Sequence, residues 1–222
     1  MIAKPEDGRA PLSATEAIVL AGGKSSRFGA DKAFARLEGQ TLLGRTVSSL
    51  ANLGFTRIAI AAPPEKVAVV GAETGVSLLA APEDPPGGGP VAGIFAGLVA
   101  LDQARADGND EDAAQVAVLA CDHPGAATVL SALLKHAEKL PPCDGVCASE
   151  DGERPQWLLA IYRLDFLRAR QRELGDGRGV AAKNLFAPAK LLPVRMNKTQ
   201  VADVDRPGDL ENFLRQVRES NV

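Results

Sequence analysis

The sequence predicts an α/β protein: a three-layer α/β/α sandwich with a mixed, mostly parallel sheet that is Rossmann-like in its first half. Strand-like and helix-like patterns alternate across residues 17–140, which is typical of parallel strands joined by right-handed crossover helices. The run at 116–120 (VAVLA) is apolar at every position, as expected for a strand covered on both faces. The hairpin signal Asp151-Gly152, between runs at 145–149 and 157–162, adds antiparallel strands.

The elements of the first half follow from periodicity and from turn residues. Leu43, Val47 and Leu50 recur at helical spacing, Thr41 can cap this helix, and Gly54 can end it. Prolines and glycines exclude regular secondary structure at 81–90. Proline has no backbone N–H to donate, and the glycine backbone is not restrained by a side chain. The expected strands are 17–21, 57–62, 76–80 and 116–120, and the expected helices are 41–53, 65–70, 90–104 and 128–140.

The second half is predicted in the same way. The glycine-rich stretch 175–179 breaks the helical pattern, and Pro207 suits the first turn of the last helix. The expected strands are 145–149, 157–162, 190–194 and 200–204, and the expected helices are 164–174, 180–186 and 205–219. We expect one domain, residues 14–222, preceded by a flexible tail at 1–13.

Composition excludes several classes of function. The chain has 222 residues and a net charge of −3, so no overall positive field exists that could attract nucleic acid. Three cysteines do not make a disulfide framework, and with only two histidines a zinc site is not expected. No apolar run of about 18 residues suits a membrane span, and no signal peptide is recognisable. These features predict a cytoplasmic protein with free thiols.

The most informative stretch is 17–32 (AIVLAGGKSSRFGADK), an apolar strand that runs into a glycine-rich loop. Glycines allow backbone N–H groups to surround an anion, and Lys24, Arg27 and Lys32 add positive charge. The spacing is not that of a Walker A loop, whose first glycine would fall on Ile18, and it does not fit the dinucleotide fingerprint. We therefore expect a polyphosphate site of another kind, the alternative being a surface turn with solvated cations.

Carboxylates are expected at the same sheet edge, where open α/β sheets bind ligands. Asp122 follows the strand 116–120, and Asp84 lies in the loop after 76–80. Asp203 lies near the end of the strand expected at 200–204, and Asp205 lies at the start of the last helix. Mg²⁺ commonly takes one or two carboxylates together with substrate phosphates, so Asp122 with Asp205 or Asp203 is a candidate seat. Asp122 and Asp205 could instead cap the helices that follow them.

These residues suit attack on the α-phosphorus of a nucleoside triphosphate, with pyrophosphate leaving. Such chemistry depends on positioning and charge stabilisation. An acceptor that is itself a phosphate needs no side-chain base, and we leave His123 out of the catalytic set.

Four motifs in order resemble those of the molybdenum cofactor guanylyltransferase family. The first resembles the signature L-A-G-G-x-S-x-R-M-G-x-D-K and stands here at residues 20–32, with Phe28 in place of methionine. The others are Gly89-Pro90-Val91-Ala92-Gly93, Cys121-Asp122-His123-Pro124 and Asp203-Val204-Asp205-Arg206-Pro207-Gly208-Asp209-Leu210. The resemblance covers about residues 17–210 and implies a fold of the nucleotide-diphospho-sugar transferase type. At 175–190, where the pterin substrate would dock, no match is clear.

The resemblance implies that GMP is transferred from GTP to the phosphate of molybdenum-molybdopterin, with Mg²⁺ as cofactor. In it, Leu-Ala-Gly-Gly goes with guanine and Leu-Ala-Ala-Gly with cytosine, so Gly22 favours GTP. The alternatives are a related cytidylyltransferase or sugar-phosphate nucleotidyltransferase, and a non-catalytic nucleotide-binding partner. Molybdoenzymes or their chaperones are implied partners, whereas nucleic acid and membranes are not expected.

The predicted site residues fall into three overlapping groups. The catalytic residues are Arg27, Lys32 and Asp122, and the metal ligands are Asp122 and Asp205. The nucleotide-binding residues are Leu20, Ala21, Gly22, Gly23, Lys24, Ser25, Lys32, Asp84 and Asp122.

Overall fold

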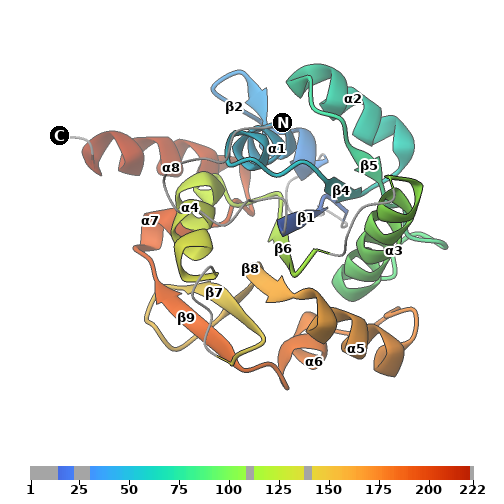
Figure 1. Cartoon of the computed structure of the whole chain (residues 1–222). Coiled ribbons are helices and arrows are strands. Elements are labelled where there is room, and N and C mark those ends of the chain that lie inside the picture. The colour runs from blue at the N-terminus through green and yellow to red at the C-terminus, as the bar shows by residue number, and fades with distance from the viewer. Residues whose placement is uncertain (1–14, 23–30, 109–112, 138–141, 221–222) are drawn as a thin grey trace, which may run out of the picture.

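The computed structural model describes residues 15–22, 31–108, 113–137 and 142–220. The expected tail at 1–13 and four predicted site residues, Gly23, Lys24, Ser25 and Arg27, lie outside the described residues. The described residues form a seven-stranded sheet with the order β5-β4-β1-β6-β8-β7-β9 (Figure 1). Its strands are β1 Thr15–Leu20, β4 Ile58–Ala61, β5 Leu79–Ala80, β6 Gln115–Ala120, β7 Gly145–Ser149, β8 Gln156–Arg163 and β9 Leu191–Arg195.

The register of the sheet collects several loops at one edge. Strand β1 is parallel to both neighbours, and its Ile18 stands beside Ala59 of β4 and Val118 of β6. Strand β8 is antiparallel to β6 and to β7, and β9 is parallel to β7. The carboxyl ends of β1, β4, β6, β7 and β9 therefore share an edge with the amino end of β8. This is the edge at which ligands of open α/β sheets bind.

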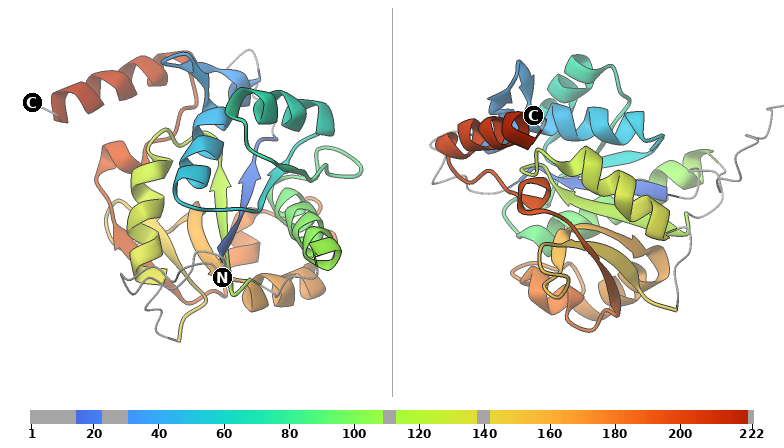
Figure 2. Two further views of the ribbon diagram at one scale, coloured as in Figure 1. Left: turned by 45° about the horizontal axis from the view of Figure 1, so that its top comes forward. Right: turned by 90° about the vertical axis from the view of Figure 1, so that its left-hand side faces the viewer.

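Helices cover both faces of the sheet, as the two further views show (Figure 2). Helices α1 Leu42–Asn52, α2 Pro64–Thr74 and α4 Ala126–Ala137 pack on one face, and α3 Pro90–Gly108, α5 Leu164–Leu174 and α6 Ala182–Phe186 pack on the other. The remaining elements are η2 Lys32–Phe34, the hairpin strands β2 Arg36–Leu37 and β3 Gln40–Thr41, α7 Lys198–Val201 and α8 Pro207–Ser220. The predicted three-layer α/β/α fold with a mixed sheet is confirmed.

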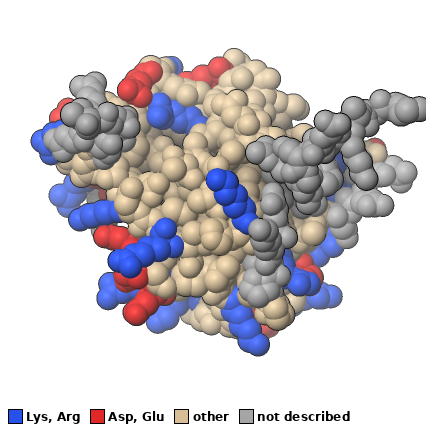
Figure 3. Space-filling model, turned by 60° about the vertical axis from the view of Figure 1, so that its left-hand side comes forward, with Lys and Arg blue, Asp and Glu red and all other residues tan. Residues whose placement is uncertain are grey.

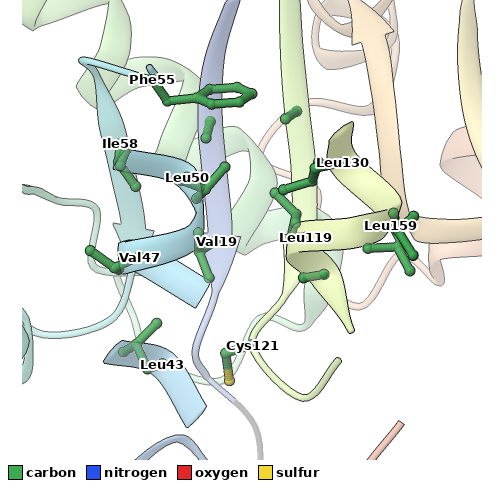
Figure 4. Packing of buried hydrophobic residues seen from close by; sticks show 14 of the residues in the cluster. Val19, Leu43, Val47, Leu50, Phe55, Ile58, Leu119, Cys121, Leu130 and Leu159 are labelled. Carbon is green, nitrogen blue, oxygen red and sulfur yellow. The ribbon is translucent and has the colours of Figure 1, made fainter. Parts of the chain in front are cut away.

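The core divides into two main apolar clusters, one on each side of the sheet. Successive residues of β1 alternate between them: Val19 packs beneath α1 and α4, and Ile18 packs beneath α3. In Figure 4, Val19 lies among Val47, Leu50 and Leu119. Because β1 is central and buried on both faces, its carboxyl end at Leu20 has a defined place in the sheet.

Most elements lie where the sequence predicts them, with three differences. The helix expected at 65–70 is longer because it continues through Gly71 to a left-handed end at Gly75 (φ 69°). The strand expected at 76–80 is reduced to β5. The prediction of a strand at 200–204 is wrong. Asn197 and Gln200 form a reciprocal capping box that starts α7 instead.

Helix α8 rests on a small third cluster that includes Leu37, Leu42, Val204 and Phe213. This contact holds the 202–206 segment, which carries Asp205, against the body of the protein.

Cys121 and Cys147 are buried and Cys143 is half-buried, and all three are free thiols, as predicted. On the face shown in Figure 3, basic and acidic side chains are interspersed and form no continuous basic surface outside the grey atoms. Among the helices that the structure describes, none combines the length and apolarity that crossing a membrane requires.

Candidate active site

Three segments that are distant in sequence meet at the carboxyl edge of the sheet. The Lys32 ammonium in η2 donates hydrogen bonds to Asp122 Oδ2 at 2.7 Å, after β6, and to Asp205 Oδ1 at 2.9 Å, before α8. The side chains of Lys32 and Asp122 are 14% and 22% exposed, whereas that of Asp205 is 52% exposed. The cluster is thus open to solvent on the Asp205 side, from which a ligand can enter.

Backbone contacts position the two loops that carry Asp122 and Asp205. The N–H of Cys121 donates to Leu20 O at 3.1 Å, which extends the pairing of β1 and β6 to the residue before Asp122. The N–H of Val204 donates to Asp122 O at 2.9 Å, so the 202–206 segment lies directly beside Asp122. The strand-end loops therefore bring Asp122 and Asp205 to the same side chain, Lys32.

Neither carboxylate caps a helix in the described structure. The N–H of Ala126, the first residue of α4, donates to the backbone carbonyl of His123, and Asp122 faces Lys32. At the start of α8, the side chain of Asp209 accepts from the N–H groups of Asp205 and Arg206 at 2.9 and 2.7 Å. The described contacts therefore do not support the helix-capping alternative for Asp122 and Asp205.

The electrostatics of the cluster favour a charged lysine. Burial lowers the pKa of Lys32, but the hydrogen bonds and charges of Asp122 and Asp205 outweigh this, so the pKa is raised above its ordinary value of 10.5. Lys32 therefore carries a positive charge throughout the neutral range. Two carboxylates against one ammonium leave an excess negative charge within this group of three, which suits a cation better than a second anion.

One oxygen of Asp122 is a candidate metal ligand. Its Oδ1 is buried and has no hydrogen-bond partner among the described residues, while His123 Nε2 lies 3.7 Å away. A buried carboxylate oxygen without a partner is unfavourable unless something binds it. Asp203 is exposed and makes no hydrogen bond or ion pair within the described parts of the chain, so Asp205 is the better partner for Asp122.

Two carboxylates are a suitable ligand set for Mg²⁺, which commonly takes one or two protein carboxylates and completes its shell with phosphate oxygens and water. Within the residues that the structure describes, no group of three or more His, Cys, Asp or Glu side chains could hold a metal on its own. The residues present thus fit a cation that arrives with a polyphosphate.

A further part of the candidate site lies at the same sheet edge, between the carboxyl ends of β1 and β4 and the start of α3. A Cβ atom on Gly22 would lie 3.5 Å from Ala61 O and 3.9 Å from Glu83 Oε1. A Cβ atom on Gly93 would lie 3.0 Å from Leu20 Cδ2 and 3.3 Å from Glu83 Oε1. Small residues here allow the first turn of α3 to approach the end of β1 closely. Glu83, which the sequence interpretation did not single out, faces both glycines.

Asp84 lies at a second hollow, which the neighbouring Glu83 also lines. Asp84 is exposed and lines a pocket of about 190 Å³ together with Asp176, Arg178 and the outer side of α3. The pocket exists because the 175–179 loop closes onto the 85–88 loop: Gly179 N–H donates to Gly88 O at 2.8 Å, and Arg178 bonds to Pro85 O. The structure thus brings Lys32, Asp122 and Asp205 together, places Leu20, Ala21 and Gly22 at the adjoining strand end, and does not join Asp84 to the Lys32 cluster by any described contact.

Comparison with known proteins assigns this arrangement to a family. A profile described as the MobA-like NTP transferase domain matches residues 17–191. The chain belongs to the MobA-like NTP transferase family. It is therefore a nucleotidyltransferase, and the predicted resemblance to the molybdenum cofactor guanylyltransferases is confirmed.

Two full-length relatives agree with the profile. A probable molybdenum cofactor guanylyltransferase of Opitutus terrae is 32% identical over 213 residues, covering 93% of this chain and 98% of the relative. A protein of the same description from Deinococcus radiodurans is 34% identical over 206 residues, covering 92% and 96%.

Solved structures share the fold at lower sequence identity. Molybdopterin-guanine dinucleotide biosynthesis protein A of Archaeoglobus fulgidus superposes with a TM-score of 0.65 at 18% identity, covering 92% of this chain and 99% of that one. A nucleotidyl transferase from Methanothermobacter gives a TM-score of 0.67 at 18% identity, covering 91% and 98%. At this identity the likeness concerns the fold alone.

Proposed function

We propose that this nucleotidyltransferase transfers GMP from GTP to the phosphate of molybdenum-molybdopterin, producing molybdopterin guanine dinucleotide and pyrophosphate. The observation that carries the proposal is the cluster of Lys32, Asp122 and Asp205 at the carboxyl edge of a MobA-like sheet. The descriptions of the two relatives support the guanylyl and molybdenum cofactor parts of it.

The proposed chemistry requires little of the protein beyond position and charge. The acceptor phosphate attacks the α-phosphorus in line with the departing pyrophosphate, and the charge that develops on the phosphate oxygens must be stabilised. Lys32 is held at the site with its ammonium group within bonding distance of two acidic side chains, so it is preorganised for this role. No side chain needs to accept a proton, because the attacking group is already an anion.

Asp122 and Asp205 would hold a Mg²⁺ ion. When bound, this ion would neutralise part of the triphosphate charge and activate the phosphate that is attacked. The protein's own part is to present Asp122 Oδ1, which has no hydrogen-bond partner among the described residues, and to keep Lys32 beside it.

The decisive experiment measures pyrophosphate release from GTP, CTP, ATP and UTP in the presence of Mg²⁺, with and without molybdopterin. We expect release that depends on molybdopterin and is fastest with GTP. Equal rates with CTP would contradict the base assignment. Release that is indifferent to molybdopterin, but is stimulated by a sugar phosphate, would contradict the acceptor assignment. Omission of Mg²⁺ and addition of a chelator is the control for metal dependence.

A further inference from the structure

Helix α2 holds the segment that carries Lys32 at both of its ends. Near its start, the Lys66 ammonium forms an ion pair with Asp31 Oδ2. In its last turn, Glu73 accepts from the N–H and the hydroxyl of Thr41 at 3.0 and 2.6 Å. Positions 66 and 73 are about two helical turns apart, so their side chains lie on one face of α2. That face spans residues 31–41, from the start of η2 to the cap of α1.

Asp31 connects this helix to Lys32. Its Oδ1 accepts from the N–H of Ala33 at 3.2 Å and so caps η2, while its Oδ2 bonds to Lys66. Both oxygens of the carboxylate are therefore engaged, and the capped turn places Lys32 between Asp122 and Asp205. A 3₁₀ turn of three residues has few internal bonds and depends on its caps and on tertiary contacts.

The charges favour the same arrangement. Asp31 adds a carboxylate next to a lysine that already faces two others. Among the described residues, Lys66 is the one that forms an ion pair with this carboxylate. Lys66 neutralises it with a side chain that is 40% exposed and comes from another element.

We propose that Lys66 is a positioning residue, which acts through Asp31 to hold Lys32 in its working orientation. The consequence for catalysis rests on the function proposed above, whereas the effect on the segment itself does not. Among the described residues the Lys66 ammonium bonds to Asp31 alone, so we expect its removal to lower the rate by loosening Lys32.

The first test is kinetic, with Mg²⁺, GTP and molybdopterin as substrates. We expect Lys66→Ala to lower kcat by about fivefold, because a loss of this size corresponds to the upper range of the free energy that a partly exposed ion pair contributes. The KM for GTP should change less. Lys66→Arg should restore most of the rate, because a guanidinium can still bond to Asp31. Lys135→Ala, which removes an exposed lysine in the last turn of α4, is the matched control and should match the wild type. A wild-type kcat in Lys66→Ala would overturn the proposal.

The second test asks whether Lys66 acts through Asp31. Asn at position 31 can still cap η2 but cannot form the ion pair, so we expect Asp31→Asn to lower kcat about as much as Lys66→Ala does. The double variant should then be no slower than either single variant, because the two changes remove one interaction. If kcat of the double variant fell by a further factor equal to that of a single variant, Lys66 would act independently of Asp31, as in direct contact with the nucleotide. That result would refute the positioning role.

The third test does not depend on activity. Hydrogen exchange, followed by mass spectrometry, should be faster in the peptide containing Ala33 and its neighbours for Lys66→Ala than for the wild type or Lys135→Ala. Unchanged exchange would refute the positioning role of Lys66, whatever the kinetics show. Faster exchange in a protein that uses none of the four nucleotides would support the positioning role and count against the proposed function instead.

Discussion

Lys32 balances two carboxylates that would otherwise repel one another across the site. Half-buried charges are tolerated when they are paired, and here one ammonium serves both Asp122 and Asp205. The pairing is incomplete, because Asp122 Oδ1 stays buried without a partner among the described residues. At this position the protein keeps a group that is unfavourable for folding, which is a common property of functional sites.

Replacement of Asp122 should therefore separate activity from stability. We expect Asp122→Ala to lower kcat/KM for pyrophosphate release by about 10²-fold or more, because an electrostatic partner of the transition state is lost. The free energy of unfolding should stay within about 1 kcal/mol of the wild-type value or rise, because an unsatisfied buried oxygen is removed. Lys32 keeps Asp205 as a partner in this variant.

Steady-state kinetics and urea denaturation, measured on the same preparations, would check both parts. Asp203→Ala, which changes an exposed aspartate nearby, is the control and should leave the rate close to that of the wild type. Retained turnover in Asp122→Ala would remove Asp122 from the catalytic group.

At the scale of elements, the close approach of α3 to β1 shapes the second half of the site. A Cβ atom on Gly97 would lie 2.6 Å from Ile18 Cγ2 and 2.9 Å from its Cγ1, and Ile18 is completely buried. The helix can lie this near only because Gly97 has no side chain. The same approach brings Gly93 against Leu20 and keeps Glu83 beside Gly22.

Gly97→Ala should therefore destabilise the protein although alanine favours helices. Overpacking a filled core costs about 1–3 kcal/mol, which exceeds the gain of up to about 1 kcal/mol from helix propensity. Gly208→Ala is the control for the clash: Gly208 lies in the first turn of α8 with nothing within 4 Å of its Cβ position, so no packing loss should appear. Urea denaturation would measure both variants, and a stabilised Gly97→Ala would contradict the packing argument.

At the scale of the whole molecule, the site is formed by segments that only the folded sheet brings together. Binding of a ligand to the native state alone stabilises it, by about 2.7 kcal/mol at a concentration 100 times the Kd. For a chain of this size, that corresponds to a rise in Tm of roughly 5–10 °C. With Mg²⁺ present, we expect GTP to raise the Tm most among the four nucleoside triphosphates.

Differential scanning fluorimetry would measure these shifts without any acceptor. The Asp122→Ala variant serves as the control for binding at the site and should show a smaller shift. Equal shifts for CTP and GTP would show that the nucleotide site does not select guanine.

The sequence was sufficient for the architecture and for the prediction that Lys32 and Asp122 lie at the same edge of the sheet. Apolar strands such as 116–120, followed by polar residues at a known edge, predict both the layer order and the convergence of Asp122 with Lys32. Thr41 as a helix cap was equally predictable, and its side chain does accept from the N–H of Gly44. Signals of this kind are local, or they follow from a general rule of sheet topology.

What the sequence did not show depends on side-chain direction and on distant contacts. The sequence favoured Asp205 as the second metal ligand but left Asp203 as an alternative, and the fold places Asp205 beside Lys32. Asp84 and Glu83 are neighbours, and only the course of the 83–88 loop decides that Glu83 faces Gly22. The apolar pattern at 200–204 suited a strand, but the capping bonds around Asn197 favoured a helix.

The order of strands in the sheet also has a consequence for how the protein behaves in concentrated solution. An open sheet has two outer strands whose unpaired backbone groups can recruit strands from other molecules and so cause aggregation. Here one outer strand, β5, has only two residues, and the other, β9, contains Pro193, which has no N–H to offer. Both borders are therefore poor templates for a further strand, which protects the chain from edge-to-edge association at high concentration.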